Sequence, residues 1–415
     1  MKKHSRESLF VLFCIVFLDM IGVGIVIPIL APLFLDATGG IFTEAVSYAT
    51  RTILFGLLIA SYPFAQFFGA PLLGGLSDRH GRKELLILSL AGTCVGYAIF
   101  ALGVMFHNIT LLFLSRILSG FTGGNISVAL SSIADVSSSQ EKARNFGLIG
   151  MAFGLGFIIG PYVGGKLADS TLVSWFNYAT PFWFAAVLSL ANIVAVCFLF
   201  RETLRHPSHA PLSILTGFQN IHKAFSLANL RVLFFVVFLI SFGFTFFTQF
   251  FPIFLIERFQ YTQSDIGDLY AYVGIWIAFT QGVIVRYLSK RFTSRQILAS
   301  SILFLAAIFP LIVYSPSSFF LLFVLPLLAI AHGVTHPHTT ALVSQLSDQK
   351  SQGEILGINQ SILSLSQAVP PVIAGFVVSL HPSMPLFVAA GFTFLAWLVF
   401  VLFFRGDGHR SHEAV

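Results

Sequence analysis

Asp19 is the carboxylate that lies deepest inside an apolar segment of this sequence. It stands about ten residues beyond the start of an expected helix at 8–34, so a rise of 1.5 Å per residue puts it ~15 Å deep, near the middle of a bilayer. Burial away from water disfavours the charged form of a carboxylate unless a cation compensates it. Such a side chain can take up and release a proton, or it can be a structural aspartate that a neighbouring group holds permanently.

Arg116 opens the segment RILSGFTGGN, inside the expected helix 108–136. It lies about six residues from the outer surface, a depth at which an unpaired charge is costly. We favour pairing with a buried carboxylate in a cavity; the alternative is extension of the side chain toward the outer headgroups. Small residues after Arg116 form a face suited to close helix packing; they are Ser119, Gly120, Gly123, Gly124 and Ser127.

The stretch GGLSDRHGRK at positions 74–83 is a charged island between two apolar runs. Its acid, Asp78, falls at a predicted helix end, where the helix dipole disfavours negative charge and a compensating cation is needed. The neighbouring basic residues can supply that cation, and the glycines permit a turn and the close approach of another helix. Simple anchoring by positive charge would require neither the acid nor the glycines. The residues expected to act together are Gly74, Asp78, Arg79, Gly81 and Arg82.

A glycine stripe runs through the expected helix 143–168, in the segment GLGFIIGPYVGG. Gly156, Gly160 and Gly164 recur every four residues and therefore share one helix face. Small residues at this spacing allow another helix to pack closely, and Pro161 is placed to bend the helix. The sequence predicts a helix that both packs tightly and flexes, and Gly165, next to the stripe, is counted with the packing residues of this motif.

Histidines cluster in the expected helix 318–346, at His332, His336 and His338. The first two are four residues apart and share a face, with His332 near mid-membrane. Three interpretations stay open: polar lining or substrate contact in a cavity, a second titrating group, or a metal-binding pair. Two histidines are half of a zinc site, and the sequence indicates no clear further ligand, so we predict no metal site. Other polar groups expected to line a cavity in this half are Gln249, Asn359 and Gln360.

The elements that must position these residues are membrane-spanning helices. Of the 415 residues, 56% are hydrophobic and 10% are charged, whereas soluble domains carry about 25% charged residues. Apolar runs of about 20 residues, each long enough to cross a bilayer as a helix, recur along the whole chain. We therefore predict an all-α polytopic membrane protein with twelve transmembrane helices, at 8–34, 51–76, 84–106, 108–136, 143–168, 181–200, 231–256, 264–289, 296–315, 318–346, 353–379 and 384–404.

Basic residues predict the orientation of these helices. Of the 23 lysines and arginines, all but four fall on the side that holds both termini; Arg51, Lys166 and Arg258 fall on the other side, and Arg116 lies within a span. The positive-inside bias makes the first side cytoplasmic. We expect a multi-pass protein of the cell (inner) membrane, with both termini in the cytoplasm and the first apolar run retained as a span.

One long polar connector divides the chain at its midpoint. We predict an N-terminal six-helix bundle at 1–200, a cytoplasmic linker at 201–230 and a C-terminal six-helix bundle at 231–415. A shift of 210 residues aligns Gly160 and Pro161 with Pro370 and Pro371, and Gly165 with Gly375. This collinear similarity suggests two pseudo-symmetric halves, the arrangement that lets a central site open to either side.

Phenylalanine is abundant, with 48 residues in the chain and a dense run at 242–251. An aromatic cavity for a lipophilic cargo is one interpretation of this run. Because phenylalanine is plentiful in every span, we expect instead that these side chains face lipid.

Four of these motifs, in this order, resemble the major facilitator superfamily, specifically its drug:proton antiporter branch, which includes the tetracycline exporters. LDMIGVGIVIP at 18–28 is similar to the first-helix motif of the branch, GGLSDRHGRK to the signature loop of the superfamily, RILSGFTGG to the fourth-helix arginine motif, and GPYVGG to the antiporter motif of the fifth helix. The resemblance covers nearly the whole chain. The second half departs from the pattern, because Lys290 stands at the position equivalent to Asp78 and no glycine turn follows it.

The resemblance implies a major facilitator fold and a role for several residues. Asp78 would brace the two halves against the start of the eleventh helix in an outward-facing state, with Asp135, Arg82 and Arg144 forming a charge relay. Arg116 would take part in proton coupling. The first, fourth, seventh and tenth helices would line the central cavity.

We therefore expect a proton-coupled secondary transporter, an antiporter that exports a small organic molecule by alternating access. Asp19 and Arg116 would couple protons, and Gln249, His332, His336, Asn359 and Gln360 would line the substrate cavity. No nucleotide-binding motif or soluble domain is seen, so the proton gradient is the expected energy source, with no cofactor, no enzymatic activity and no nucleic-acid partner. A functional monomer is expected. The alternatives are uptake by proton symport, a dedicated metabolite or metal-chelate transporter, and a non-transporting membrane receptor.

Overall fold

The computed structural model describes residues 2–36, 39–137, 142–204, 213, 215–227, 230–346 and 352–404, and all regular structure within them is helical. The helices of the first half are α1 (Lys2–Ile25), α2 (Ile27–Leu35), α3 (Tyr48–His80), α4 (Arg82–Met105), α5 (Ile109–Thr122), α6 (Asn125–Val136), α7 (Lys142–Leu167) and α8 (Thr180–Leu199). After the connector helix α9 (Thr216–Ser226), the second half contains α10 (Arg231–Phe259), α11 (Gln263–Phe279), the π-helical turn η1 (Thr280–Ile284), α12 (Val285–Ser289), α13 (Ser294–Val313), α14 (Ser318–Gln345), α15 (Gln352–Leu380) and α16 (Met384–Phe403).

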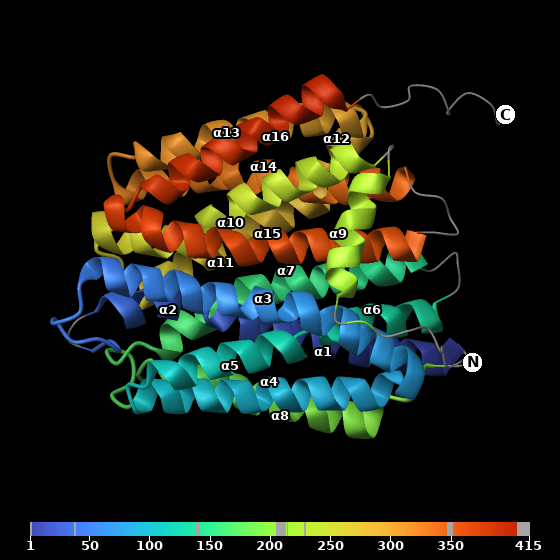
Figure 1. The fold of residues 1–415 in the computed structure, drawn as a ribbon, viewed down its shortest axis with the longest axis horizontal. Helices are drawn as coiled ribbons and strands as arrows, with labels where there is room; N and C mark the ends of the chain where they lie inside the picture. Colours follow the sequence, from blue (N-terminus) through green and yellow to red (C-terminus); the bar gives the residue numbers. More distant parts are fainter. Residues whose placement is uncertain are drawn as a thin grey trace.

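The predicted spans are confirmed. Among the described residues, eleven helices or runs of consecutive helix are long and apolar enough to cross a membrane, and each coincides with a predicted segment. The remaining prediction, 143–168, coincides with α7, which has 26 residues. The helices of the two halves form two bundles that lie side by side, in the lower and upper parts of Figure 1.

Three of the predicted spans are interrupted. The first is divided at Val26 into α1 and α2, because Pro28 lacks the backbone N–H that would continue the hydrogen-bond ladder. The fourth is divided between Thr122 and Asn125, where two consecutive glycines weaken the helix. The eighth contains the π-helical turn η1, a feature that is frequent at functional sites.

The two sides of the bundle are distinguished by where the chain begins. We call the side at which α1 begins and α16 ends the terminal face, and the other side, where α2 and α4 end, the opposite face (Figure 1). Helix α9 runs across the long helices near the terminal face, roughly perpendicular to them (Figure 1). It packs against both α3 of the first half and α15 of the second.

The glycine stripe of α7 packs directly on α1. A methyl group added at Gly160 would lie 2.7 Å from the carbonyl oxygen of Ile21 and 2.8 Å from the Cα of Gly24. Both distances are below van der Waals contact, so the two backbones can approach this closely only while these positions remain glycine. The contact holds α1, and Asp19 with it, at a defined position inside the first half.

The two halves meet through glycines near the opposite face. A Cβ added to Gly56 of α3 would lie 3.0 Å from the Cα of Gly375 on α15. A Cβ added to Gly165 of α7 would lie 3.2 Å from the Cα of Gly267 on α11. The Phe55 ring packs edge-on against Phe250 of α10, with 5.3 Å between ring centroids. Helices from the two halves are therefore in backbone contact at this end of the molecule.

The phenylalanine run at 242–251 lies within the protein, so the expectation that it faces lipid is wrong. Most of its phenylalanines are covered by protein, because α10 packs against α15, α16 and α2. The fully or nearly fully covered side chains are Phe242, Phe246, Phe247, Phe250 and Phe251.

Candidate functional site

Asp19 is buried on α1, where a side chain from α6 binds it. The Nδ2 group of Asn125 donates a hydrogen bond to Oδ2 of Asp19 at 2.9 Å. Both residues are buried, at 8% exposure for Asp19 and 2% for Asn125. No described cation forms an ion pair with this carboxylate, so the partner that the described residues provide is a neutral hydrogen-bond donor rather than a lysine or arginine.

Arg116 is surrounded by aromatic rings. Its guanidinium carbon lies 4.7 Å from the ring centroid of Phe100, 5.9 Å from that of Tyr62 and 6.0 Å from that of Tyr97. Its Nε and Nη2 have no hydrogen-bond partner among the described residues. The expected pairing with a buried carboxylate is therefore not found in the described part of the chain, and cation–π contacts take its place.

Tyr62 and Tyr97 connect the surroundings of Arg116 with those of Asp19. The Tyr97 hydroxyl lies 2.7 Å from where a Cβ of Gly22 would be, one helical turn beyond Asp19 on α1. The Tyr62 hydroxyl lies 2.5 Å from the equivalent point on Gly123, two residues before Asn125. Both tyrosines thus place a ring beside the guanidinium and a hydroxyl beside the helix segments that carry Asp19 and Asn125.

The signature loop is organised by Arg82. Its guanidinium pairs with Asp78 at 2.5 Å and with Asp135 at 3.1 Å, and it donates to the Ser77 hydroxyl at 2.6 Å. The Arg82 side chain is buried, whereas Asp78 is about two-fifths exposed. Arg82 therefore joins the end of α3 to the end of α6 within the first half.

Glu202, just after α8, caps the N-terminus of α4. Its carboxylate accepts from the backbone N–H groups of Arg82 and Lys83, both at 3.0 Å, and from its own neighbours Thr203 and Leu204. Although partial burial alone would raise the pKa of Glu202, these backbone donors hold it below its usual value. The carboxylate lies so close to Gly81, whose φ of 112° is a glycine conformation, that a side chain there would collide with it.

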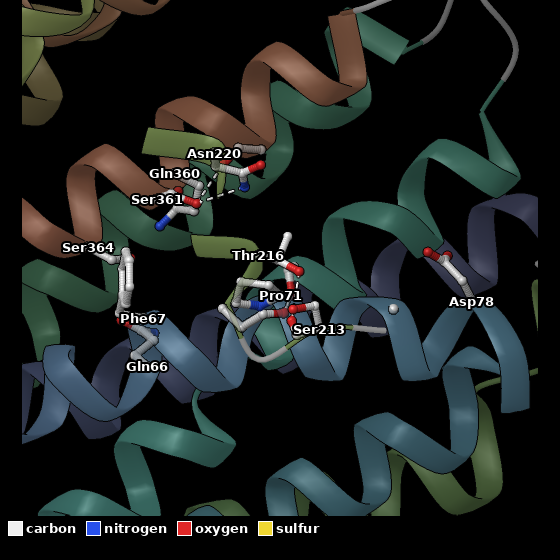
Figure 2. A pocket seen from close by; sticks show the side chains of 14 residues that line it. Gln66, Phe67, Pro71, Asp78, Ser213, Thr216, Asn220, Gln360, Ser361 and Ser364 are labelled. Carbon is white, nitrogen blue, oxygen red and sulfur yellow. Dashed lines mark hydrogen bonds between the residues drawn. The ribbon is translucent and has the colours of Figure 1, made fainter. Parts of the chain in front are cut away.

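A cavity of about 310 Å³ separates the two halves toward the terminal face. Figure 2 shows Gln360, Ser361 and Ser364 of α15 on one side, and Gln66, Phe67 and Pro71 of α3 on the other. Helix α9 contributes Thr216 and Asn220, and Nδ2 of Asn220 donates to the Ser361 hydroxyl at 3.0 Å (Figure 2). Because α3 and α15 touch at Gly56 and Gly375 but part here, the described state is closed at the opposite face and hollow at the terminal face.

Asp78 lines this cavity, and none of the described contacts joins its side chain to α15. The contact expected between Asp78 and the start of the eleventh helix belongs to an outward-facing state, and here Asp78 is engaged with Arg82 instead. Gln360 also lines the cavity. Gly74 lies beside it, with the position of its Cβ 3.5 Å from the Ser127 hydroxyl.

The histidines of α14 have three different environments. His332 stacks on Phe244 of α10, with 3.6 Å between ring centroids and an angle of 2° between planes. His336 is exposed, and its ring lies 6.2 Å from that of His332. His338 is buried and bonded to the Ser289 hydroxyl and to a backbone oxygen of its own helix, which gives it a structural tie to α12. No group of three metal-binding side chains occurs among the described residues.

The other predicted cavity residues of the second half are not brought together by any described hydrogen bond. Gln249 is half-buried on α10. Asn359 is buried on α15, and its Oδ1 has no partner among the described residues.

Two predicted arginines of the first half remain. Arg79 lies in the last turn of α3. Arg144 falls within α7, but its side chain lies outside the described residues.

An ion pair joins the halves at the opposite face. Lys166 of α7 contacts Asp268 of α11 and donates to the Ser264 hydroxyl, both at 2.8 Å. Gln263 donates to the backbone oxygen of Ala168 at 3.2 Å. These polar contacts surround the glycine contact between α7 and α11, at the end of the segment GPYVGG.

Several residues of the site were missed by sequence reasoning. A polar residue directly after a glycine pair in an apolar span was a signal for Asn125, and an acid directly after the end of a span was a signal for Glu202. Lys166 was expected on the side away from the termini, and no partner was predicted for it. Nothing in the spacing of Tyr62 or Tyr97 indicated that they would flank Arg116.

Comparisons with known proteins agree with this architecture. The family model described as Major Facilitator Superfamily matches residues 12–298 and 233–414. The tetracycline resistance protein, class C, of Escherichia coli is 30% identical over 396 residues, covering 95% of this chain and 94% of that protein. The quinolone resistance protein NorA of Staphylococcus aureus is 28% identical over 402 residues, covering 96% of each chain.

Solved structures show the same fold. The human organic anion transporter MFSD10 (TETRAN) superposes with a TM-score of 0.73 at 25% identity, over 95% of this chain and 99% of that one. A bacterial homolog of the human lysosomal transporter Spinster, in an inward-facing and unoccupied conformation, superposes with a TM-score of 0.76 over 97% of this chain and 98% of that one. Its identity of 16% makes it a likeness of fold alone.

Proposed function

This chain belongs to the major facilitator superfamily of membrane transporters, and we propose that it is a proton-coupled antiporter that exports a small organic molecule. The observation that carries the proposal is Asp19: a buried carboxylate inside a membrane span, bound to Asn125 and without an ion-pair partner among the described residues. A carboxylate that no cation neutralises can change its protonation state at low cost, which is what a proton carrier requires.

Alternating access links this proton exchange to cargo movement. In the state described, the halves touch near the opposite face and are separated by the cavity near the terminal face. Asp19 would release its proton on the open side while cargo binds. Rocking of the halves would then open the opposite face, where cargo leaves and Asp19 takes up a new proton.

The direction of transport follows from the orientation proposed for the chain. The basic residues between spans gather at the terminal face, so we assign this face to the cytoplasm and the protein to the inner membrane. A proton gradient directed inward would then drive cargo outward. No cofactor is needed for this cycle, and one chain would contain the whole pathway.

The experiment uses purified protein in liposomes that contain a pH-sensitive dye. Because the relatives are named for resistance to tetracycline and quinolones, one compound of each class is offered as cargo against an imposed proton gradient. We expect proton flux opposite to cargo flux in the wild type and loss of coupling in Asp19→Asn. The control, Asp265→Asn, changes an exposed acid at the start of α11 and is expected to keep coupling.

Each outcome decides one part of the proposal. Full coupling in Asp19→Asn would refute the role of Asp19. Proton flux in the same direction as cargo would replace antiport by symport. Cargo movement with no accompanying proton flux would refute proton coupling altogether.

A further inference from the structure

We propose that Asn125 is the positioning residue for proton exchange at Asp19: its amide donates to the carboxylate and accepts from the protonated carboxyl. The inference rests on the proposed function, because it assigns a partner to the proton carrier. It concerns a residue that lies on a different helix from Asp19 and 106 positions away in sequence.

The geometry supports the first part of this role, which is to donate a hydrogen bond to the charged carboxylate. Nδ2 of Asn125 is 2.9 Å from Oδ2 of Asp19, and both side chains are more than nine-tenths buried. An N–H group that donates to a charged oxygen stabilises the charge more than it would stabilise a neutral oxygen. With Nδ2 toward Asp19, Asn125 therefore favours the ionised carboxylate.

The oxygen of the same amide supports the second part of this role, which is to accept a hydrogen bond from the protonated carboxyl. Oδ1 of Asn125 is buried and has no hydrogen-bond partner among the described residues. A protonated carboxyl has one O–H donor, and an amide oxygen accepts it. A half-turn of the Asn125 amide about its terminal torsion exchanges Nδ2 for Oδ1, so one side chain can serve both protonation states without any other movement. The proton itself passes between Asp19 and water, and no bond between heavier atoms changes.

The other groups near Asp19 cannot replace Asn125 in this role. Tyr62 of α3 and Tyr97 of α4 place their rings beside Arg116 of α5, but no described hydrogen bond joins either of them to the carboxylate. Helices α2 and α8 carry no acid, histidine, lysine or arginine, and α7 faces α1 with its glycine stripe. Among the described residues, Asn125 is the side chain that is hydrogen-bonded to Asp19.

The break between α5 and α6 gives Asn125 its position. Asn125 is the first residue of α6, after the glycine pair 123–124 that interrupts the fourth span. The N-terminus of a helix carries partial positive charge, which adds to the stabilisation of a nearby carboxylate. Discontinuous helices of this kind are used by transporters to place polar groups at membrane depth, and a break can move when the halves rock.

The test measures the protonation of Asp19 directly. Infrared difference spectra of the purified protein in liposomes are recorded over a pH titration, without cargo, and the carboxyl band of Asp19 is identified by its absence in Asp19→Asn. In Asn125→Leu, the charged form loses a strong hydrogen bond and the protonated form loses a weaker one. We expect the midpoint of the band to move to higher pH by about one unit, and Asn125→Gln to recover most of this shift.

Asn192→Leu is the matched control. Asn192 is equally buried, donates to the backbone oxygen of Ile15 on α1 at 3.0 Å, and also has an Oδ1 without a partner among the described residues. It therefore reports the loss of a buried amide that holds α1 but not Asp19. If Asn125→Leu does not fold, Asn125→Ala makes the same comparison because it removes the amide without adding volume.

The outcomes separate this inference from the proposed function. A midpoint that moves with Asn125→Leu or Asn125→Ala but not with Asn192→Leu supports it. Equal midpoints in all variants, or equal shifts at both asparagines, overturn it while leaving Asp19 as the carrier. If Asp19 shows no titrating band at all, the proton-coupling proposal fails as well.

Discussion

Replacing Gly165 by alanine is expected to open the opposite face of this transporter. Gly165 is the point at which α7 of the first half touches α11 of the second. Its Cβ would lie 2.5 Å from the carbonyl oxygen of Gln263 and 3.2 Å from the Cα of Gly267. Ordinary van der Waals contact begins at 3.4 Å, so the shorter contact must lengthen by about 0.9 Å. Backbone atoms cannot move aside alone, and the two helices must part.

The cost falls on one conformation only. Overpacking of a tight contact costs ~1–3 kcal/mol, and here it is incurred in the state in which α7 and α11 touch. The nearby ion pair between Lys166 and Asp268 weakens too as the helices separate. A penalty of that size, applied to one of two states, changes their ratio by ~5- to ~150-fold. We expect the ratio of the state open at the opposite face to the state closed there to rise by this factor.

Distances between spin labels measure the population directly. One label replaces Phe106, at the end of α4, and the other replaces Tyr314, at the end of α13; both side chains are exposed at the opposite face, one in each half. The native cysteines are first removed. The label-to-label distance distribution in liposomes is expected to gain a longer component in Gly165→Ala.

The matched control is Gly154→Ala on the same helix. A Cβ at Gly154 would meet no described atom within 4 Å, so this variant has the same change in helix propensity without the collision. It should keep the wild-type distribution. A Gly165→Ala protein with an unchanged distribution, or a Gly154→Ala protein with an equal change, would refute the argument that backbone contact at Gly165 closes this face.

Three further predictions follow from the contacts at the terminal face. Arg82→Leu leaves Asp135 without its cation. Because the Asp135 carboxylate is partly exposed, we expect the free energy of unfolding to fall by about 2 kcal/mol, less than the ~3–5 kcal/mol lost when a fully buried pair is broken. Thermal melting of Arg82→Leu beside Arg82→Lys measures this loss, and an unchanged melting temperature in Arg82→Leu would contradict it. Glu202 has its pKa held below the ordinary value of 4.5, so the stability it contributes is complete above that pH and is lost as the pH falls through its lowered pKa. Glu202→Gln should therefore lower the melting temperature at neutral pH and remove part of its decline in acid; a parallel decline in both proteins would speak against this. Asn220→Ala removes the hydrogen bond to Ser361, which is expected to contribute about 1 kcal/mol to the packing of α9. Amide hydrogen exchange in α9 should therefore be faster in this variant than in the wild type. Equal exchange rates in the two proteins would show that the bond does not hold this helix.

The spans could be predicted from sequence because their signal is local. A helix that crosses a membrane needs about 20 apolar residues in succession, and each predicted segment coincides with one helix or a run of consecutive helices in the structure. The same holds for the packing of the glycine stripe at Gly156, Gly160 and Gly164, because small residues at a spacing of four share one helix face whatever their neighbours are. The interruptions of the first and fourth spans had signals in Pro28 and in the glycine pair at 123–124, although uninterrupted helices were expected.

The partners of the polar residues could not be predicted in this way. Which residue meets Asp19 depends on how α1 and α6 are rotated about their own axes, and hydrophobic length carries no information on rotation. Arg116 was expected to meet a carboxylate and instead meets three aromatic rings. The phenylalanine run at 242–251 was assigned to the lipid face because a helix that is apolar all round has no sequence signal for its buried side.

The sequence by itself therefore determined the membrane class, the positions of the helices and the motifs of the family, since each depends on residues that are close together in the chain. Tertiary structure alone decided that Asn125 holds Asp19 and that Glu202, from the connector, caps α4 at a separation of 120 positions. It also decided that the halves touch at the opposite face and part at the terminal face. The physical reason is that close contacts between helices come from backbone approach at small residues, and the matching surface lies on another helix far away in the chain.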